Sequence, residues 1–194
     1  LGGTSWPSTL AYYRILNELA QARLGGFHSA RIILSSIDYH EIKSRYNSGW
    51  DEIPALLGKE IRALADMRPD CLLICNNTLH KAFDAIAAEL ALPMPVFHIV
   101  EATGRAARTR GLRRLLLLGT RFTMEDGFYQ RQLEKFGLHV ATPTADERSV
   151  IQNIQSQLAR GVTADAFRRT LAELIDRYAG SADAAVLACT ELPL

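Results

Sequence analysis

Two short segments of the chain contain the residue types best suited to chemistry. Residues 75–80 read Cys-Asn-Asn-Thr-Leu-His, and residues 189–191 read Cys-Thr-Glu. In both segments a cysteine follows an apolar run and precedes polar side chains. A thiol can act as a base or as an acid, because its pKa of about 8.5 is readily lowered beside helix N-termini and polar hydrogens. Both segments are therefore candidates for proton transfer.

The apolar runs of the chain predict strands of a parallel sheet. Residues 72–74, just before Cys75, and residues 115–118 show no polar alternation, as in strands that helices cover on both faces. Elsewhere, short apolar runs alternate with stretches of helical period, which indicates an α/β fold. Helices are predicted over residues 9–24, 51–67, 78–90, 100–110, 124–136, 146–160 and 164–178. Strands are predicted over residues 31–37, 71–75, 96–99, 112–118, 138–141 and 184–188.

The chain repeats its own pattern. Residues 3–6 read Gly-Thr-Ser-Trp with two tyrosines soon after, and residues 119–122 read Gly-Thr-Arg-Phe with Phe-Tyr soon after. Gly3 lies 72 residues before Cys75, and Gly119 lies 70 residues before Cys189. We interpret this similarity as a duplication, which predicts two similar Rossmann-like lobes with parallel sheets related by a pseudo-twofold axis.

The duplication also predicts where the site lies. Open α/β sheets bind ligands at the carboxyl ends of their strands, so we expect an active site in the cleft between the two lobes. The first lobe is predicted over residues 1–95 and the second over residues 96–194, with the C-terminal end returning toward the first lobe. Both chain ends look truncated, because Leu1 resembles the exit of a strand and a helix is expected after Leu194.

Composition narrows the classes of function. The chain has 194 residues, of which 48% are hydrophobic, and its 22 Lys and Arg against 21 Asp and Glu give a net charge of +1. Such a balance argues against nucleic-acid and membrane-surface binding. No apolar stretch is long enough to span a bilayer and no signal peptide is recognisable. Three cysteines do not suggest a disulfide framework, so we expect reduced thiols and a cytoplasmic protein.

The two cysteine segments resemble those of the aspartate/glutamate racemase family, which pairs Cys-Asn-Thr-x-His in the first half with Cys-Thr-Glu in the second. The similarity extends to Gly-Gly-Thr-Ser-Trp-Pro-Ser-Thr at residues 2–9, Leu-Gly-Thr-Arg-Phe-Thr-Met-Glu at residues 118–125 and Ala-Cys-Thr-Glu-Leu-Pro-Leu at residues 188–194. The resemblance implies racemisation of an acidic amino acid by two thiols, one on each face of the α-carbon. An α-proton beside a carboxylate is a weak acid, so inversion needs an activated base, an opposite acid and donors that hold the enediolate.

The same resemblance assigns residues to the substrate. Cys189 is the implied acid/base on one face, and the other polar side chains of the matching segments would hold the substrate's polar groups. These implied substrate-binding residues are Thr4, Ser5, Thr9, Asn77, Thr78, Thr120, Thr123, Thr190 and Glu191. His80 is interpreted either as an acid or pKa tuner, or as a residue that orients the loop.

The first segment departs from the family pattern. When residues 77–80 are aligned with Asn-Thr-x-His, the catalytic cysteine is replaced by Asn76, and Cys75 lies one residue early. Successive residues at a strand end point to opposite sides, so Cys75 would turn away from a pocket that Asn76 faces. Since an asparagine cannot transfer protons near neutral pH, racemisation would be one-sided. The competing register makes Cys75 the base. With Cys71, Cys75 is otherwise interpreted as a buried small hydrophobic residue.

No cofactor or metal is expected. Pyridoxal phosphate needs a lysine, and of the four lysines only Lys81 lies beside a motif, inside a predicted helix. No phosphate-binding loop pattern is complete. A homodimer is the working hypothesis for the oligomeric state.

Two alternatives remain open at this point. Superfamily relatives with a single key thiol, such as arylmalonate decarboxylases and maleate isomerases, suggest a one-thiol enzyme. Alternatively, Asn76 could mark an amino-acid-binding protein that has lost the chemistry. In the loop 40–50, Arg45 and Tyr46 are interpreted as solvated, with binding of a side-chain carboxylate as the alternative.

Overall fold

The computed structural model describes residues 1–193 and confirms an α/β fold with parallel sheets. The chain forms two compact units, Leu1–Phe97 and His98–Leu194. No helix within residues 1–193 combines the length and the apolar character needed to cross a membrane. Each unit is described separately below.

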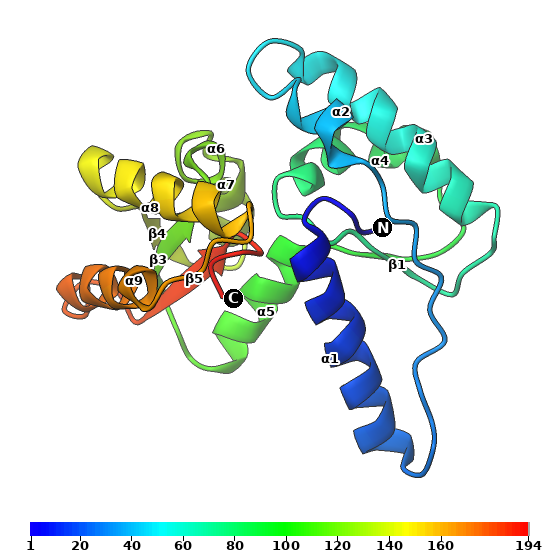
Figure 1. Cartoon of the computed structure of the whole chain (residues 1–194), viewed down its shortest axis with the longest axis horizontal. Coiled ribbons are helices and arrows are strands. Elements are labelled where there is room, and N and C mark those ends of the chain that lie inside the picture. The colour runs from blue at the N-terminus through cyan, green and yellow to red at the C-terminus, as the bar shows by residue number, and fades with distance from the viewer. Residues whose placement is uncertain (194) are drawn as a thin grey trace. The chain divides into compact units, whose positions relative to one another are not determined.

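The first unit is mostly helical (Figure 1). Its elements are α1 (Trp6–Leu24), α2 (Tyr39–Lys43), a 3-10 turn (Trp50–Glu52), α3 (Ile53–Ala65), β1 (Leu72–Leu73), α4 (Leu79–Leu90) and β2 (Val96–Phe97). β1 and β2 pair in parallel, with Leu72 opposite Val96. The buried core joins Leu57 and Ile61 of α3 to Leu79 of α4. The last four residues of α2 lie within the predicted loop 40–50, and Arg45 Nε in this loop donates to Glu52 Oε2 at 2.6 Å.

The predicted strand over residues 31–37 is wrong as an assigned strand. Only one bridge forms there, between Gly2 and Ser36, with Gly2 N donating to Ser35 O at 2.8 Å and Ile37 N to Gly2 O at 3.1 Å. A strand needs consecutive ladder bonds to a neighbour. No backbone partner of this kind is described for residues 31–34, so their β-branched and apolar composition is not sufficient to define a strand.

Gly3 allows the opening loop to pass close to this segment. Its φ is +88°, and a Cβ added there would lie 2.2 Å from the backbone oxygen of Ile37. A side chain would therefore meet backbone atoms, which cannot move aside cheaply, in a conformation that L-residues rarely adopt. Steric crowding by the backbone of Ile37 thus explains why the repeated Gly-Thr pattern has a glycine at position 3.

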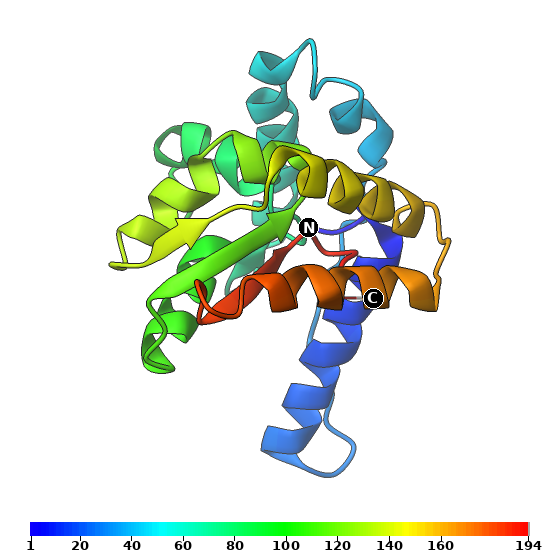
Figure 2. The same ribbon diagram turned by 90° about the vertical axis from the view of Figure 1, so that its left-hand side faces the viewer.

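The second unit is a three-stranded parallel sheet between two layers of helices. Its elements are α5 (Ile99–Thr109), β3 (Arg114–Gly119), α6 (Arg121–Glu125), α7 (Phe128–Glu134), β4 (His139–Ala141), α8 (Ala145–Leu158), α9 (Asp165–Arg177) and β5 (Ala184–Ala188). Figure 2 shows β3 in green between β4 in yellow-green and β5 in red, the order β4-β3-β5.

The apolar side chains of β3 pack against helices on both faces of the sheet. The lack of polar alternation in this run predicts such packing. Leu116 and Leu118 pack with side chains of α8 and α9. Leu115 and Leu117 pack with side chains of α5 and α7 on the opposite face. Because successive strand residues point to opposite faces, only a continuous apolar run can fill both cores.

Two further predicted elements break or end at a single residue. The helix predicted over 124–136 is divided into α6 and α7, because Gly127 adopts a φ of +81° that a helix cannot contain. The strand predicted over 96–99 ends at Phe97, because the His98 ring nitrogen accepts a hydrogen bond from Val100 N at 3.2 Å and caps α5. A left-handed backbone conformation at Gly127 and a side-chain cap at His98 decide these two boundaries.

Candidate active site

The opening loop of the first unit is tied to the first cysteine segment. Thr4 Oγ1 donates to the Cys75 carbonyl at 3.1 Å, and Cys75 N donates to Leu1 O at 2.9 Å. Thr9 Oγ1 accepts from Gly3 N at 3.0 Å and donates to Ser5 O at 2.9 Å. Two of the threonines predicted to bind substrate, Thr4 and Thr9, are therefore buried and hold this loop in place.

Asn76 and Cys75 occupy different environments. Cys75 is buried, which raises the pKa of its thiol and disfavours the thiolate. Asn76 is half-buried, and its side-chain oxygen accepts from Leu79 N at 2.9 Å, so it caps the first turn of α4. His80 Nδ1 lies 2.7 Å from the Asn76 carbonyl oxygen. His80 thus contacts the loop that precedes it. This contact fits a residue that orients the loop, which is one of the two roles considered from the sequence.

Two oxygens in the first unit are buried and lack a hydrogen-bond partner among residues 1–193. They are Asn77 Oδ1 and Ser5 Oγ. Buried polar atoms are almost always satisfied, and an orphaned one requires an explanation such as a missing ligand. Both atoms belong to residues predicted to bind substrate. The neighbouring Thr78, which has the same prediction, is buried.

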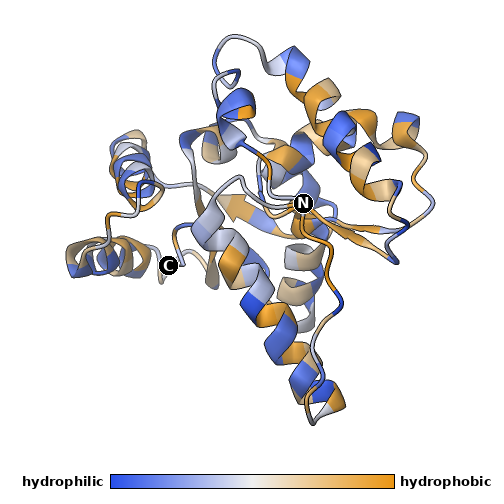
Figure 3. Cartoon of the chain, turned by 45° about the vertical axis from the view of Figure 1, so that its right-hand side comes forward, coloured by the Kyte–Doolittle hydropathy of each residue, from blue (hydrophilic) through white to orange (hydrophobic). Residues whose placement is uncertain are grey.

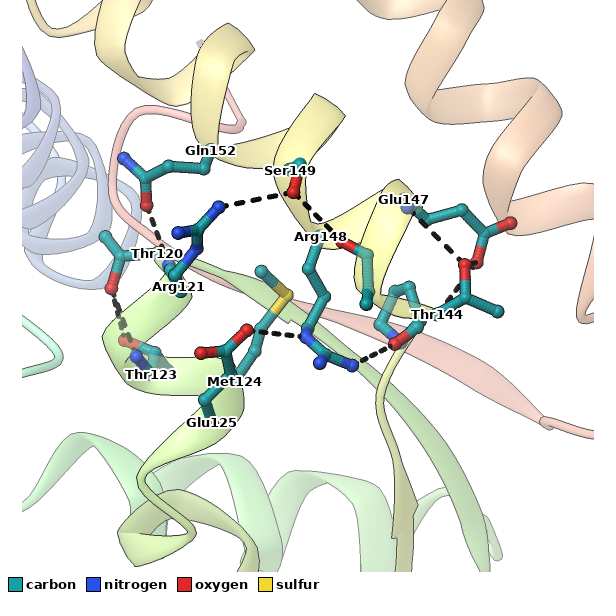
Figure 4. Close-up of polar contacts among 12 residues, drawn as sticks. Thr120, Arg121, Thr123, Met124, Glu125, Thr144, Glu147, Arg148, Ser149 and Gln152 are labelled. Carbon is teal, nitrogen blue, oxygen red and sulfur yellow. Dashed lines mark hydrogen bonds and ion pairs between the residues drawn. The ribbon is translucent and has the colours of Figure 1, made fainter.

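The equivalent opening loop of the second unit begins where β3 ends. Thr120 Oγ1 accepts from Thr123 N at 3.1 Å and lies 3.0 Å from Thr123 Oγ1. Figure 4 shows how α6 is fastened to α8. Arg121 N donates to Gln152 Oε1 at 2.7 Å, and Arg148 Nε donates to Glu125 Oε1 at 2.9 Å. The first and last residues of α6 are therefore both attached to α8.

Cys189 lies beside this loop, at the end of β5. The register pairs Gly119 of β3 with Ala188 of β5, so Thr120 and Cys189 both follow strand ends at the carboxyl edge of one sheet. At the opposite edge, Asp183 accepts from the backbone amides of Arg114 and Arg113, contacts that lower the pKa of its carboxyl group to about 2 and tie β5 to β3.

The turn after Cys189 brings a carboxylate back onto the thiol. Cys189 Sγ donates to Glu191 Oε2 at 2.8 Å, and Thr190 Oγ1 donates to the same oxygen at 3.1 Å. Leu192 N closes the turn by donating to Cys189 O at 3.1 Å. Cys189 and Glu191 are both about 5% exposed. This arrangement provides a buried thiol with an adjacent proton acceptor.

The sequence assigns Glu191 to the substrate and does not identify its contact with Cys189. The available signal was the spacing, since a residue two positions after a strand end can fold back in a tight turn. Cys71, interpreted from sequence as buried, is exposed. Within residues 1–193, no group of three or more His, Cys, Asp and Glu side chains is arranged to hold a metal ion.

Comparison with known proteins identifies the family. The family model described as Asp/Glu/Hydantoin racemase matches residues 1–194. The chain belongs to this family.

Solved structures of Asp/Glu racemases share the fold of the chain. A Yersinia pestis protein described as a candidate Asp/Glu racemase is 37% identical, with a TM-score of 0.87 over 99% of this chain and 84% of its own. An aspartate racemase homologue from Pyrococcus horikoshii is 30% identical, with a TM-score of 0.83 and the same coverage.

Glutamate racemases match shorter parts. The Thermus thermophilus enzyme is 33% identical over 85 residues, which are 44% of this chain and 29% of the relative. The Aquifex aeolicus glutamate racemase is 25% identical over 133 residues, 68% of this chain and 50% of the relative. The matched segments therefore span half or less of these two enzymes.

Proposed function

We propose that the chain racemises an acidic amino acid, aspartate or glutamate, without pyridoxal phosphate. Cys189 exchanges the α-proton on one face of the substrate. Asn76 takes the position of the family's other catalytic thiol, so that turnover is one-sided. The observation that carries this proposal is the buried Cys189 thiol, 2.8 Å from the Glu191 carboxylate in the Cys-Thr-Glu segment of a racemase-family chain.

The orphaned oxygens of the first unit support an amino-acid ligand. A carbonyl oxygen such as Asn77 Oδ1 accepts hydrogen bonds from an ammonium group, which every α-amino acid carries. The Ser5 hydroxyl can donate to a carboxylate oxygen. A free amino acid would thus satisfy both groups, and we assign Ser5 and Asn77 to substrate binding.

A one-thiol reaction other than racemisation is the second candidate. The side-chain oxygen of Asn76 is engaged by the α4 backbone, so the residue has a structural role as a helix cap. An enzyme with Cys189 as its single proton-transfer group could act as a decarboxylase or isomerise a double bond, and product identification separates these reactions from racemisation.

Incubation in deuterated water tests the proposed function. With L- and D-aspartate and L- and D-glutamate supplied separately, we expect the α-proton signal of one amino acid to disappear faster than in a protein-free sample, with the opposite enantiomer accumulating. Proton NMR and optical rotation measure the two events. Ligand binding without α-deuteration would instead indicate a binding protein, and neither event with any of the four would contradict the proposal.

We also propose a cytoplasmic homodimer. The exposed side chains of α1 support an interface, since Trp6, Leu10 and Tyr13 follow helical spacing and each exposes more than half of its surface. Figure 3 shows hydrophobic positions along α1. Contiguous exposed apolar side chains on a helix are typical of interaction surfaces.

The free thiols of Cys71, Cys75 and Cys189 suit a reducing compartment.

Light scattering after size exclusion checks the dimer. We expect about twice the chain mass of 21.5 kDa, and the monomer mass for Leu10→Glu/Tyr13→Glu, which places charges in the apolar stripe. Ile15→Glu is the matched control, because Ile15 is also apolar and exposed but lies on another face of α1. A wild-type monomer at micromolar concentration would contradict the proposal.

A further inference from the structure

The short helix α6 needs support from elsewhere in the second unit. It has five residues, Arg121–Glu125, and a helix of this length is unstable by itself because nucleation costs more than its few hydrogen bonds return. It starts directly after Thr120, the first residue beyond β3, at the sheet edge where open α/β sheets bind ligands. The contacts that hold α6 therefore also hold Thr120 at this edge.

Gln152 of α8 supplies a contact to the backbone of this loop. Its Oε1 accepts from Arg121 N at 2.7 Å, and Figure 4 shows the side chain reaching from α8 to that nitrogen. Two other described contacts between α6 and α8 join side chains to side chains, from Arg121 Nη2 to Ser149 Oγ at 3.2 Å and from Arg148 to Glu125. Such pairs of long side chains fix the backbone less firmly than a contact to the backbone amide itself.

Two groups on α8 determine which end of the Gln152 amide faces α6. Gln152 Nε2 donates to Gln155 Oε1 at 3.0 Å and to Ser156 Oγ at 3.1 Å. Because the nitrogen is held in this way, the amide presents its oxygen to Arg121 N, whereas a flipped amide would bring two donors together. Gln155 is buried, so its own position is restricted. The acceptor for Arg121 N is therefore preorganised.

We propose that Gln152 is a positioning residue for substrate binding by Thr120. Arg121 N belongs to the peptide group that follows Thr120, so the Gln152 contact fixes that peptide and keeps Thr120 extended, at φ −65° and ψ 158°. In this conformation Thr120 Oγ1 accepts from Thr123 N at 3.1 Å, which restrains the direction of the hydroxyl. The inference rests on the proposed function and on the substrate contact expected of Thr120.

Gln152→Leu removes the acceptor with little change in side-chain size. We expect the KM of α-proton exchange to rise about 10- to 100-fold, because a misplaced substrate-holding group weakens binding, with kcat changed by less than about threefold. Gln152→Glu keeps an oxygen for Arg121 N, and Gln155 can turn its amide to donate to the carboxylate, so this variant should keep a KM near that of the wild type. Asn153→Leu is the matched control, since it makes a similar amide-to-leucine change at an exposed position of α8.

Hydrogen exchange of the Arg121 amide, followed by NMR, tests the contact without activity. This amide is engaged by Gln152 in the wild type, and in Gln152→Leu it should exchange with solvent at least about tenfold faster. Gln155→Leu allows the Gln152 amide to flip, so it should give a smaller increase and add nothing when combined with Gln152→Leu. Ser149→Ala removes the contact of the Arg121 side chain and should leave exchange at the backbone amide unaltered.

An unchanged KM in a folded Gln152→Leu whose Arg121 amide exchanges faster would overturn the positioning role, because the contact would then be only structural. Equal increases of KM in Gln152→Leu and Gln152→Glu would overturn it as well. If Gln152→Leu does not fold, Gln155→Leu decides by the same two measurements.

A wild type that exchanges no α-proton with any of the four amino acids would contradict the proposed function, and calorimetric Kd values for the same amino acids would then replace KM. A weaker Kd in Gln152→Leu than in Gln152→Glu would support the role of Gln152. The same Kd in both variants, or no binding by the wild type, would overturn it.

Discussion

Cys189→Ala is expected to lower α-proton exchange by at least about 10²-fold, the usual contribution of a positioned acid or base. Cys189 directly follows β5, and in the proposed function its thiol is the group that exchanges the α-proton on one face of the substrate, so its removal takes away that proton-transfer group. The fold should survive, because Ala replaces a small side chain and typical single substitutions cost about 1 kcal/mol. Deuterium incorporation by NMR measures the loss, and circular dichroism checks the fold.

Cys71→Ala is the matched control for this experiment. Cys71 is an exposed thiol, whereas Cys189 is buried, so the same chemical change at Cys71 should leave exchange unaltered. Full exchange by a folded Cys189→Ala protein would remove Cys189 from the reaction. Equal losses in both variants would instead point to a general effect of removing a cysteine.

Much of the fold could be predicted because it depends on periodic apolar patterns. The run over residues 115–118 defines β3 and implies helices on both faces, and the structure has both layers. The failures occur where single contacts decide. A strand at residues 31–37 requires ladder partners that lie far away in sequence, and the helix break at Gly127 requires a left-handed φ that many glycines do not adopt.

The site was predictable as a set of segments and not as a set of contacts. The repeated Gly-Thr loops and the two cysteines could be found by spacing, and in the structure Thr4 does meet Cys75. Sequence reasoning could not assign the partner of Glu191, because side-chain direction after a strand end depends on the turn. It also missed that the Asn76 side chain caps α4.

The second large expected effect concerns which residue of the first cysteine segment occupies the catalytic position, and it is measured as a racemisation rate. If Asn76 holds the family's catalytic position, Asn76→Cys should raise racemisation of the disfavoured enantiomer by about 10²–10⁴-fold, because it supplies the missing acid or base. The gain should come with lower stability, since loss of the cap contact to Leu79 N costs about 0.5–2 kcal/mol. Asn76→Ser keeps a capping oxygen without a thiol, so it should show no gain.

Cys75→Ser tests the competing register. Burial raises the pKa of the Cys75 thiol, so little thiolate is available there near neutral pH. We therefore expect Cys75→Ser to lower the melting temperature more than the rate, because the hydroxyl enters a buried position. Initial rates from both enantiomers decide between the registers. A folded Cys75→Ser protein without activity, together with no gain in Asn76→Cys, would show that Cys75 is the second base and that both thiols take part in racemisation.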